Sequence, residues 1–153
     1  MNGKRGLITV ALLVCITGAG AAEREAVNLH DAWIAEGPPM VKRHAGYVEI
    51  DNSGPTDVTL KEVTSPDFGR IEIHRSVIDN GIAKMLYQRS VTIPANGHLS
   101  FAPGGYHLML LNAHKPLTEG ASVSLTFTFN NGDIIHTEAK IKKLQNAAIP
   151  SND

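Results

Sequence analysis

Apolar and polar residues alternate over short stretches along most of the chain, and turn-forming residues separate these stretches. Alternation with a period of two is typical of β-strands that bury one face. The pattern predicts strands over 29–35, 45–51, 57–64, 70–78, 82–89, 98–102, 106–111, 122–129 and 133–142. Regularly spaced short strands with almost no helical periodicity predict an all-β fold of one domain, an antiparallel β-sandwich or barrel.

Two of the predicted strand pairs carry a hairpin signal between them. Val123, Leu125, Phe127 and Phe129 alternate with Ser and Thr, and Asn131-Gly132 follows them. Asn80-Gly81 likewise separates 70–78 from 82–89. Asn-Gly tolerates the positive φ angles of a tight turn, so both segments are predicted to be β-hairpins.

The first 21 residues differ from the rest of the chain. A basic start, "MNGKRG", precedes the apolar run "LITVALLVCITGAGA", which ends in the small-x-small pattern Ala19-Gly20-Ala21. This layout predicts a signal peptide over 1–21 that directs export to the periplasm, a mature domain over 22–143 and a tail over 144–153 without assigned structure. A lipid anchor at Cys15 is the weaker interpretation, because Val14 before it is not a small residue and the apolar run continues past it.

Cleavage changes both the charge and the chemistry of the chain. It leaves 12 basic residues (14 minus 2) against 15 acidic ones, with no basic patch, which argues against a nucleic-acid partner. Cys15 is the only cysteine, so the mature chain has no disulfide and no thiolate. The fold must therefore be held by its core, with no membrane anchor after cleavage.

Chemically distinctive residues occur on two predicted strand regions. In the hairpin around Asn80-Gly81, a two-residue turn pairs positions that sum to 161, which puts His74 and Met85 on one face as diagonal neighbours. In "YHLMLL" at 106–111, His107 and Met109 share the face opposite Tyr106, Leu108 and Leu110. Two imidazoles and two thioethers form a plausible four-ligand set.

The ligand types select the metal. Thioether sulfur is soft and suits Cu(I), imidazole suits copper generally, and a zinc site more usually recruits cysteine or carboxylates. A blue-copper electron-transfer centre requires a cysteine that the mature chain lacks, so these ligands suit a copper carrier better than a redox centre. The alternative is that the four side chains are incidental packing or surface residues.

Read together, His74, Met85, His107 and Met109 give the spacing H-x10-M-x21-H-x-M. That spacing closely resembles the PCu(A)C family of periplasmic copper chaperones. So do "AWIAEGPP" at 32–39, "AGYVEI" at 45–50, "IEIH" at 71–74 and "PGGYHLML" at 103–110. The resemblance extends from about Asn28 to Lys142.

The resemblance implies a cupredoxin-like Greek-key β-sandwich that binds one Cu(I) ion through these four residues. It further implies a monomeric, non-enzymatic chaperone that delivers copper to the dinuclear copper site of cytochrome c oxidase subunit II, alongside Sco-type proteins. Many relatives carry a His- and Met-rich C-terminal extension. This tail has neither residue, so a second copper site there is not expected.

The remaining candidates are assigned lesser roles. Glu72 is expected to share the face of His74 and to orient its imidazole. Met40 could cover the site or add a thioether, and Trp33 is expected to anchor the core. The other histidines are expected to be surface or structural residues: His30, His44, His98, His114 and His136.

Two functions from other classes remain open. One is a copper-sequestering protein that protects the periplasm, and the other is a metal-free β-sandwich binding module. An enzyme is not expected, because no nucleophile-base pair stands in a recognisable context and "PGGY" is too generic for a phosphate loop.

Overall fold

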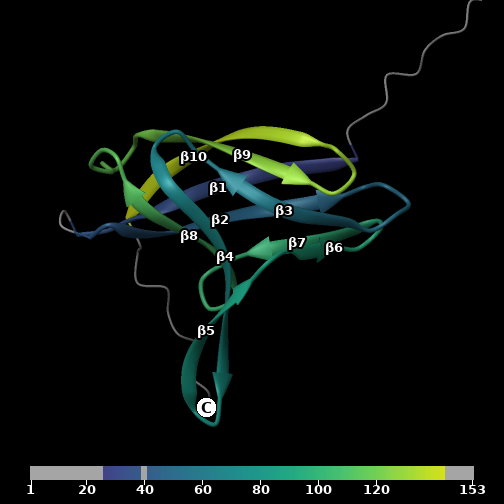
Figure 1. Ribbon diagram of the computed structural model, residues 1–153, viewed down its shortest axis with the longest axis horizontal. Coiled ribbons are helices and arrows are strands. Elements are labelled where there is room, and N and C mark those ends of the chain that lie inside the picture. The colour runs from purple at the N-terminus through teal and green to yellow at the C-terminus, as the bar shows by residue number, and fades with distance from the viewer. Residues whose placement is uncertain (1–25, 39–40, 144–153) are drawn as a thin grey trace, which may run out of the picture.

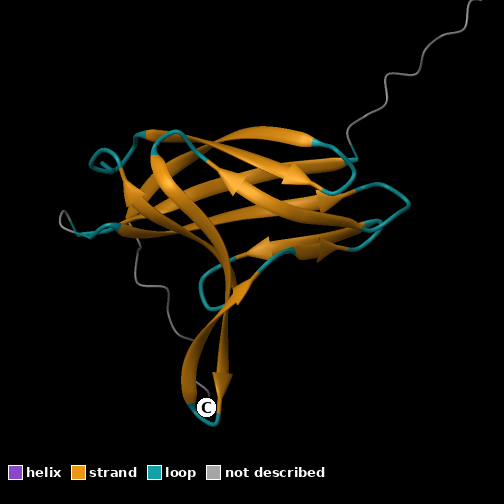
Figure 2. Cartoon of the chain, viewed as in Figure 1, coloured by secondary structure: helices purple, strands orange, loops and turns teal. Residues whose placement is uncertain are grey.

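A computed structural model describes residues 26–38 and 41–143 of the chain, and within these ranges it contains strands and no helix (Figure 2). In the described ranges no helix is long and apolar enough to cross a membrane. The all-β prediction is confirmed. The strands are β1 (Val27–Glu36), β2 (Arg43–Asn52), β3 (Val58–Thr64), β4 (Phe68–Asp79), β5 (Ile82–Gln88), β6 (Val91–Ile93), β7 (Gly97–Phe101), β8 (Tyr106–Ala113), β9 (Ser122–Phe129) and β10 (Ile134–Lys143).

All ten strands belong to one hydrogen-bonded sheet that wraps around the core. Its order is β5-β4-β8-β7-β2-β1-β10-β9-β3-β6, and β8 also pairs with β2. Most pairings are antiparallel, as expected, but β1 pairs with β10 in parallel and β7 meets β8 in parallel. β5 and β6 form the two edges of the sheet.

The core follows from the alternation seen in the sequence. On β9, Val123, Leu125, Phe127 and Phe129 are buried while the intervening Ser and Thr residues are not. The three-residue strand β6 was not among the predicted strands, yet its Val91 and Ile93 are both buried. The largest fully buried side chains are Phe101, Phe127, Ile34, Ile50, Leu60, Ile93, Leu108, Leu110, Leu125, Ile141, Val27 and Val48.

The two hairpins use different turns. Asn80 and Gly81 have φ angles of 51° and 76°, and the ladder pairs His74 with Tyr87 and Ser76 with Met85, which confirms the predicted register. Positive φ at both central residues is the signature of a type I′ turn. In the β9–β10 hairpin only Gly132 has positive φ, and the longer connection replaces the expected Asn-Gly turn.

The β4–β5 hairpin extends away from the rest of the sandwich (Figure 1). The first half of β4 pairs with β8 inside the body, and its second half continues outward with β5 as a two-stranded ribbon. The predicted signal peptide at 1–21, Met40 and the tail at 144–153 lie outside the described residues.

Candidate metal centre

The structure brings the four candidate ligands to one face of three adjacent strands. β4 lies between β5 and β8, and the ladder places His74 directly opposite His107. Met109 is opposite Glu72, and Met85 is opposite Ser76. Met85 and Met109 are therefore both diagonal neighbours of His74, one on each side.

Glu72 orients His74, as expected from their spacing. The Nε2 atom of His74 lies 3.0 Å from Oε2 of Glu72, and the other carboxylate oxygen of Glu72 accepts from Arg70 at 2.6 Å. Because a carboxylate only accepts hydrogen bonds, Nε2 carries the hydrogen and donates it. The lone pair of His74 is then on Nδ1, which is buried and has no hydrogen-bond partner.

In His107 the roles of the two ring nitrogens are the reverse of those in His74. Its Nδ1 atom donates to the carbonyl oxygen of Gly105 at 3.2 Å, and this oxygen also accepts the backbone N–H of Ser76 at 3.0 Å. Its Nε2 atom is buried without a partner. Burial lowers the pKa of His107, which favours the neutral ring that a metal ligand requires.

The two rings lie close together, with centroids 5.8 Å apart and planes inclined by 57°. A buried nitrogen without a hydrogen bond costs about 1–3 kcal/mol, so each of these two atoms is available to a ligand. A metal ion bound by both rings would satisfy both lone pairs, and the hydrogen bonds of the other two nitrogens fix the rings as metal-bound histidines usually are. The donor set of two imidazoles and two thioethers fits Cu(I).

A site made of harder ligands is not formed by the described residues. Among them, no group of three or more His, Cys, Asp or Glu side chains is placed to hold a metal ion. The methionine sulfurs of the same face are further donors that could complete the coordination of a metal at His74 and His107. Thioether sulfur suits a soft cation.

The two methionines differ in exposure. Met109 is half-buried between β2 and β4, whereas Met85 is 63% exposed on the projecting hairpin. Tyr87 lies edge-on to His74 with ring centroids 6.0 Å apart. The candidate centre is thus closed on the β8 side and open to solvent on the β5 side.

Four of the other histidines make hydrogen bonds outside the candidate centre, as expected, whereas the Nδ1 atom of His44 is buried without a hydrogen-bond partner. His30 and His98 hydrogen-bond to Asp51, His114 to the carbonyl oxygen of Pro66, and His136 to the Thr126 hydroxyl. His44 is buried on the core side of β2, against Phe68. None of them joins the His74–His107 pair.

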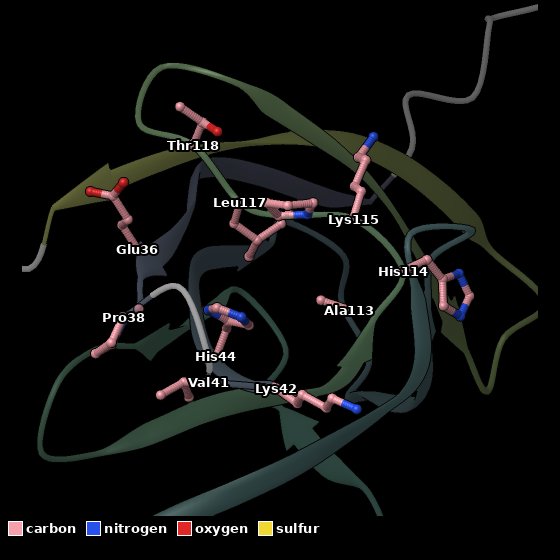
Figure 3. A pocket seen from close by; sticks show the side chains of 12 residues that line it. Glu36, Pro38, Val41, Lys42, His44, Ala113, His114, Lys115, Leu117 and Thr118 are labelled. Atoms are coloured by element: carbon pink, nitrogen blue, oxygen red, sulfur yellow. The ribbon is translucent and has the colours of Figure 1, made fainter.

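A cavity of the described residues lies elsewhere. It has a volume of about 710 Å³ and is lined by His44, Lys42, Glu36, Lys115 and neighbouring residues (Figure 3). None of the four candidate ligands lines it. A metal centre needs converging donor atoms rather than a large hollow, so the His-Met face remains the candidate.

One sequence-based expectation is wrong, and one contributor to the site was missed. Trp33 is not part of the core. Its ring lies against that of Tyr47, with centroids 4.5 Å apart and planes tilted by 36°, and the Lys142 ammonium is 6.0 Å from the centroid of its ring. The Gly105 carbonyl was not identified as a neighbour of the ligands, because a backbone oxygen leaves no signal in a sequence. The predicted pairing of the hairpin had already placed Tyr87 opposite His74, and the structure confirms it.

Comparisons with known proteins agree with this architecture. The family described as putative lipoprotein LpqE-like matches residues 27–141. A putative lipoprotein, Lxx21020, of Leifsonia xyli subsp. xyli (strain CTCB07) is 27% identical over 155 residues, which cover 94% of this chain and 92% of that protein.

Solved structures of copper-binding domains have the same fold. The copper-bound PCuAC domain from PmoF2 matches with a TM-score of 0.67 at 19% identity, over 78% of this chain and 94% of that one. CuI-DR1885 from Deinococcus radiodurans matches with a TM-score of 0.65 at 27% identity, over 82% of this chain and 84% of that one. The cupredoxin-like fold is therefore confirmed, as is the resemblance to PCu(A)C domains, and the chain belongs to the LpqE-like family.

Proposed function

We propose that this protein is a Cu(I)-binding metallochaperone of the cell envelope, with His74, Met85, His107 and Met109 as the copper ligands. The observation that carries the proposal is the pair of buried ring nitrogens, His74 Nδ1 and His107 Nε2, which face no hydrogen-bond partner. Similarity to a copper-bound PCuAC domain and to CuI-DR1885 supports copper as the cargo and Cu(I) as its state.

The specific role that we propose is delivery of copper to the dinuclear copper site of cytochrome c oxidase subunit II, with Sco-type proteins as partners in the same route. The exposure of Met85 supports delivery over sequestration, because an acceptor ligand can replace an exposed thioether first. The protein acts as a monomer and has no catalytic activity. Its predicted signal peptide and the lipoprotein names of its family and relative support an exported protein, which we place in the periplasm.

An anaerobic Cu(I) titration against a chromogenic chelator tests the site. The mature chain from Ala22 should hold one tight equivalent, and Met85→Ala combined with Met109→Ala should lose it. His107→Ala should weaken binding equally strongly while the fold survives, and His136→Ala serves as the control for loss of a surface imidazole. Equal Cu(I) affinity in all four proteins would refute the ligand assignment, and failure of the parent to compete for Cu(I) would favour a metal-free binding module.

A transfer assay separates delivery from sequestration. The copper-loaded chain is mixed with the soluble, metal-free domain of cytochrome c oxidase subunit II, and formation of its dinuclear centre is followed by absorbance. Delivery predicts faster loading than free Cu(I) achieves at the same concentration. Retention of copper against this acceptor would assign the protein to sequestration.

A further inference from the structure

The β4–β5 hairpin gathers most of the large apolar side chains that the described residues expose. Seven such side chains are exposed in the described ranges, and five of them lie on this hairpin: Ile78, Ile82, Met85, Leu86 and Tyr87. Single exposed apolar residues are normal on a protein surface. Five on one ribbon that extends away from the body (Figure 1) indicate a surface that contacts another molecule.

The register divides these side chains between the two faces of the ribbon. Ile78, Met85 and Tyr87 share the face of His74 and are 74%, 63% and 63% exposed; we call these three residues the metal face of the hairpin. The opposite face carries Ile82 and Leu86 together with charged residues: Arg75 and the ion pair of Lys84 with Asp79.

The metal face carries no charge between His74 and the turn. The other residues on the same side of the ribbon there are Ser76 and Ala83. At the base of the hairpin, Arg70 and Glu72 of that face pair with each other. A charged surface docked on this face would bury its charges against apolar side chains without compensation, which is costly.

We propose that the metal face of the hairpin is the docking surface for the copper acceptor, and that the acceptor presents an uncharged, apolar surface around its own copper ligands. This inference rests on the proposed function. Transfer by ligand exchange requires an acceptor donor atom to enter the coordination sphere while the ion is still held. Met85 is the most exposed of the four ligands, and Ile78 and Tyr87 flank it, so an apolar partner seated on them reaches the copper at Met85.

The test uses two matched variants of exposed, non-ligand residues on opposite faces of the ribbon. Ile78→Ser alters the metal face, and Leu86→Ser alters the other face at a site that is 45% exposed. Chelator competition should give the parent Cu(I) affinity for both variants. The second-order rate of Cu(I) transfer to the soluble oxidase subunit II domain should fall about tenfold for Ile78→Ser and stay at the parent value for Leu86→Ser.

Salt dependence gives a second, independent readout. Charge-steered association slows steeply as ionic strength rises, whereas apolar docking does not. We expect the parent transfer rate to change by less than about threefold between low and high salt. A steep fall would mean that charged groups guide the encounter and would overturn the proposal.

Each of the other possible results also tests a stated part of the proposal. Parent-like transfer by Ile78→Ser, an equal loss in Leu86→Ser, or weakened Cu(I) binding in Ile78→Ser would overturn the docking role and leave the copper site intact. A parent that binds Cu(I) but transfers none to this domain would refute the oxidase as acceptor together with its docking. A parent that binds no Cu(I) would refute the proposed function itself.

Sedimentation of the copper-loaded chain should show monomers, and a dimer that Ile78→Ser abolishes would assign the surface to a second copy instead.

Discussion

At the scale of single residues, one carboxylate decides which nitrogen of His74 is free. Glu72 lies two positions before His74 on the same strand, and its oxygen fixes the hydrogen on Nε2 at 3.0 Å. The lone pair is thereby left on Nδ1, and the ring of His107, whose Nε2 is also without a partner, lies 5.8 Å away between centroids. The strand alternation predicted this contact, because residues two apart share a face.

Glu72→Ala is expected to weaken Cu(I) binding about 10- to 100-fold, the usual effect of losing a hydrogen-bond partner of a metal-bound histidine. The physical reason is that the ring of His74 loses both its orientation and its preferred tautomer. Glu72→Gln keeps an oxygen acceptor and should retain most of the affinity. Chelator competition measures the affinity, and circular dichroism checks that the fold is unchanged.

Arg70→Ala is the matched control for this prediction. It removes the ion pair of Glu72 but leaves the hydrogen bond to His74 in place, so it should bind Cu(I) as the parent does. If Arg70→Ala and Glu72→Ala lose affinity equally, the charge pair rather than the imidazole contact governs the site.

The sequence pattern predicted each of the two ligand pairs but not the strand pairing that brings them together. Alternation placed His107 and Met109 together, and the hairpin rule placed His74 and Met85 together. The direct pairing of His74 with His107 comes from β4 lying against β8, two strands that are far apart in the chain. Pairings of this kind depend on the whole sheet and leave no local signal.

At the scale of the element, turn chemistry explains why one hairpin was predicted more closely than the other. Asn80 and Gly81 both adopt positive φ, so the two-residue turn fixes the register that carries Met85 to the face of His74. In the β9–β10 connection only Gly132 does so. The strand β6 was missed because three residues are too few to display an alternation.

Gly81→Val tests whether the hairpin turn positions Met85. Gly81 has a φ of 76°, where a β-branched side chain costs about 1–3 kcal/mol. Cu(I) binding should weaken, because a displaced turn moves Met85 relative to His74. The melting temperature should change little, since the residues around the turn, Asp79 to Ile82, are exposed and outside the core.

Gly132→Val is the comparison variant. Its φ is 96°, and its hairpin joins strands that carry the buried Phe127 and Phe129. It should lower the melting temperature while leaving Cu(I) affinity at the parent value. Unchanged Cu(I) affinity in Gly81→Val would show that Met85 binds, if at all, without help from the turn.

At the scale of the whole molecule, distant segments hold the sandwich together. β1 and β10, the first and last described strands, pair in parallel through Trp33–Glu36 and Lys140–Lys143. The sequence predicted both strands but not this pairing, which joins the two ends of the domain. Since the described residues include no cysteine, this closure depends on burial, as at Ile34 and Ile141.

Ile141→Ala should therefore destabilise the entire domain. The side chain is 2% exposed and lies in the core next to the parallel β1–β10 contact. Truncation of a buried isoleucine to alanine costs about 2–5 kcal/mol. Urea unfolding should show one cooperative transition shifted to lower denaturant, and a transition of parent stability would mean that the two ends do not close the domain.

A polar network on the outer surface links β1, β2 and β7 and predicts how stability varies with pH. His30 on β1 contacts Asp31 and Asp51, and His98 on β7 contacts Asp51 and Glu49 of β2. Hydrogen bonds to Asp31 and then Asp51 raise the pKa of His30 above its ordinary 6.5. Hydrogen bonds from His98 and then His30 lower the pKa of Asp51 below 3.8.

The signs of these two shifts define the pH window in which His30 stabilises the fold. A histidine with a raised pKa stabilises the folded chain below 6.5 and loses this contribution as the pH rises through its folded pKa, whereas Asp51 contributes above 3.8 and loses its share in stronger acid. His30→Ala should thus lower the melting temperature most near pH 5 and progressively less above pH 7. His136→Ala, which removes a ring bonded to the Thr126 hydroxyl, controls for the loss of a surface imidazole. A His30→Ala difference that stays constant from pH 5 to 9 would mean that the carboxylates around His30 add nothing to the joining of these strands.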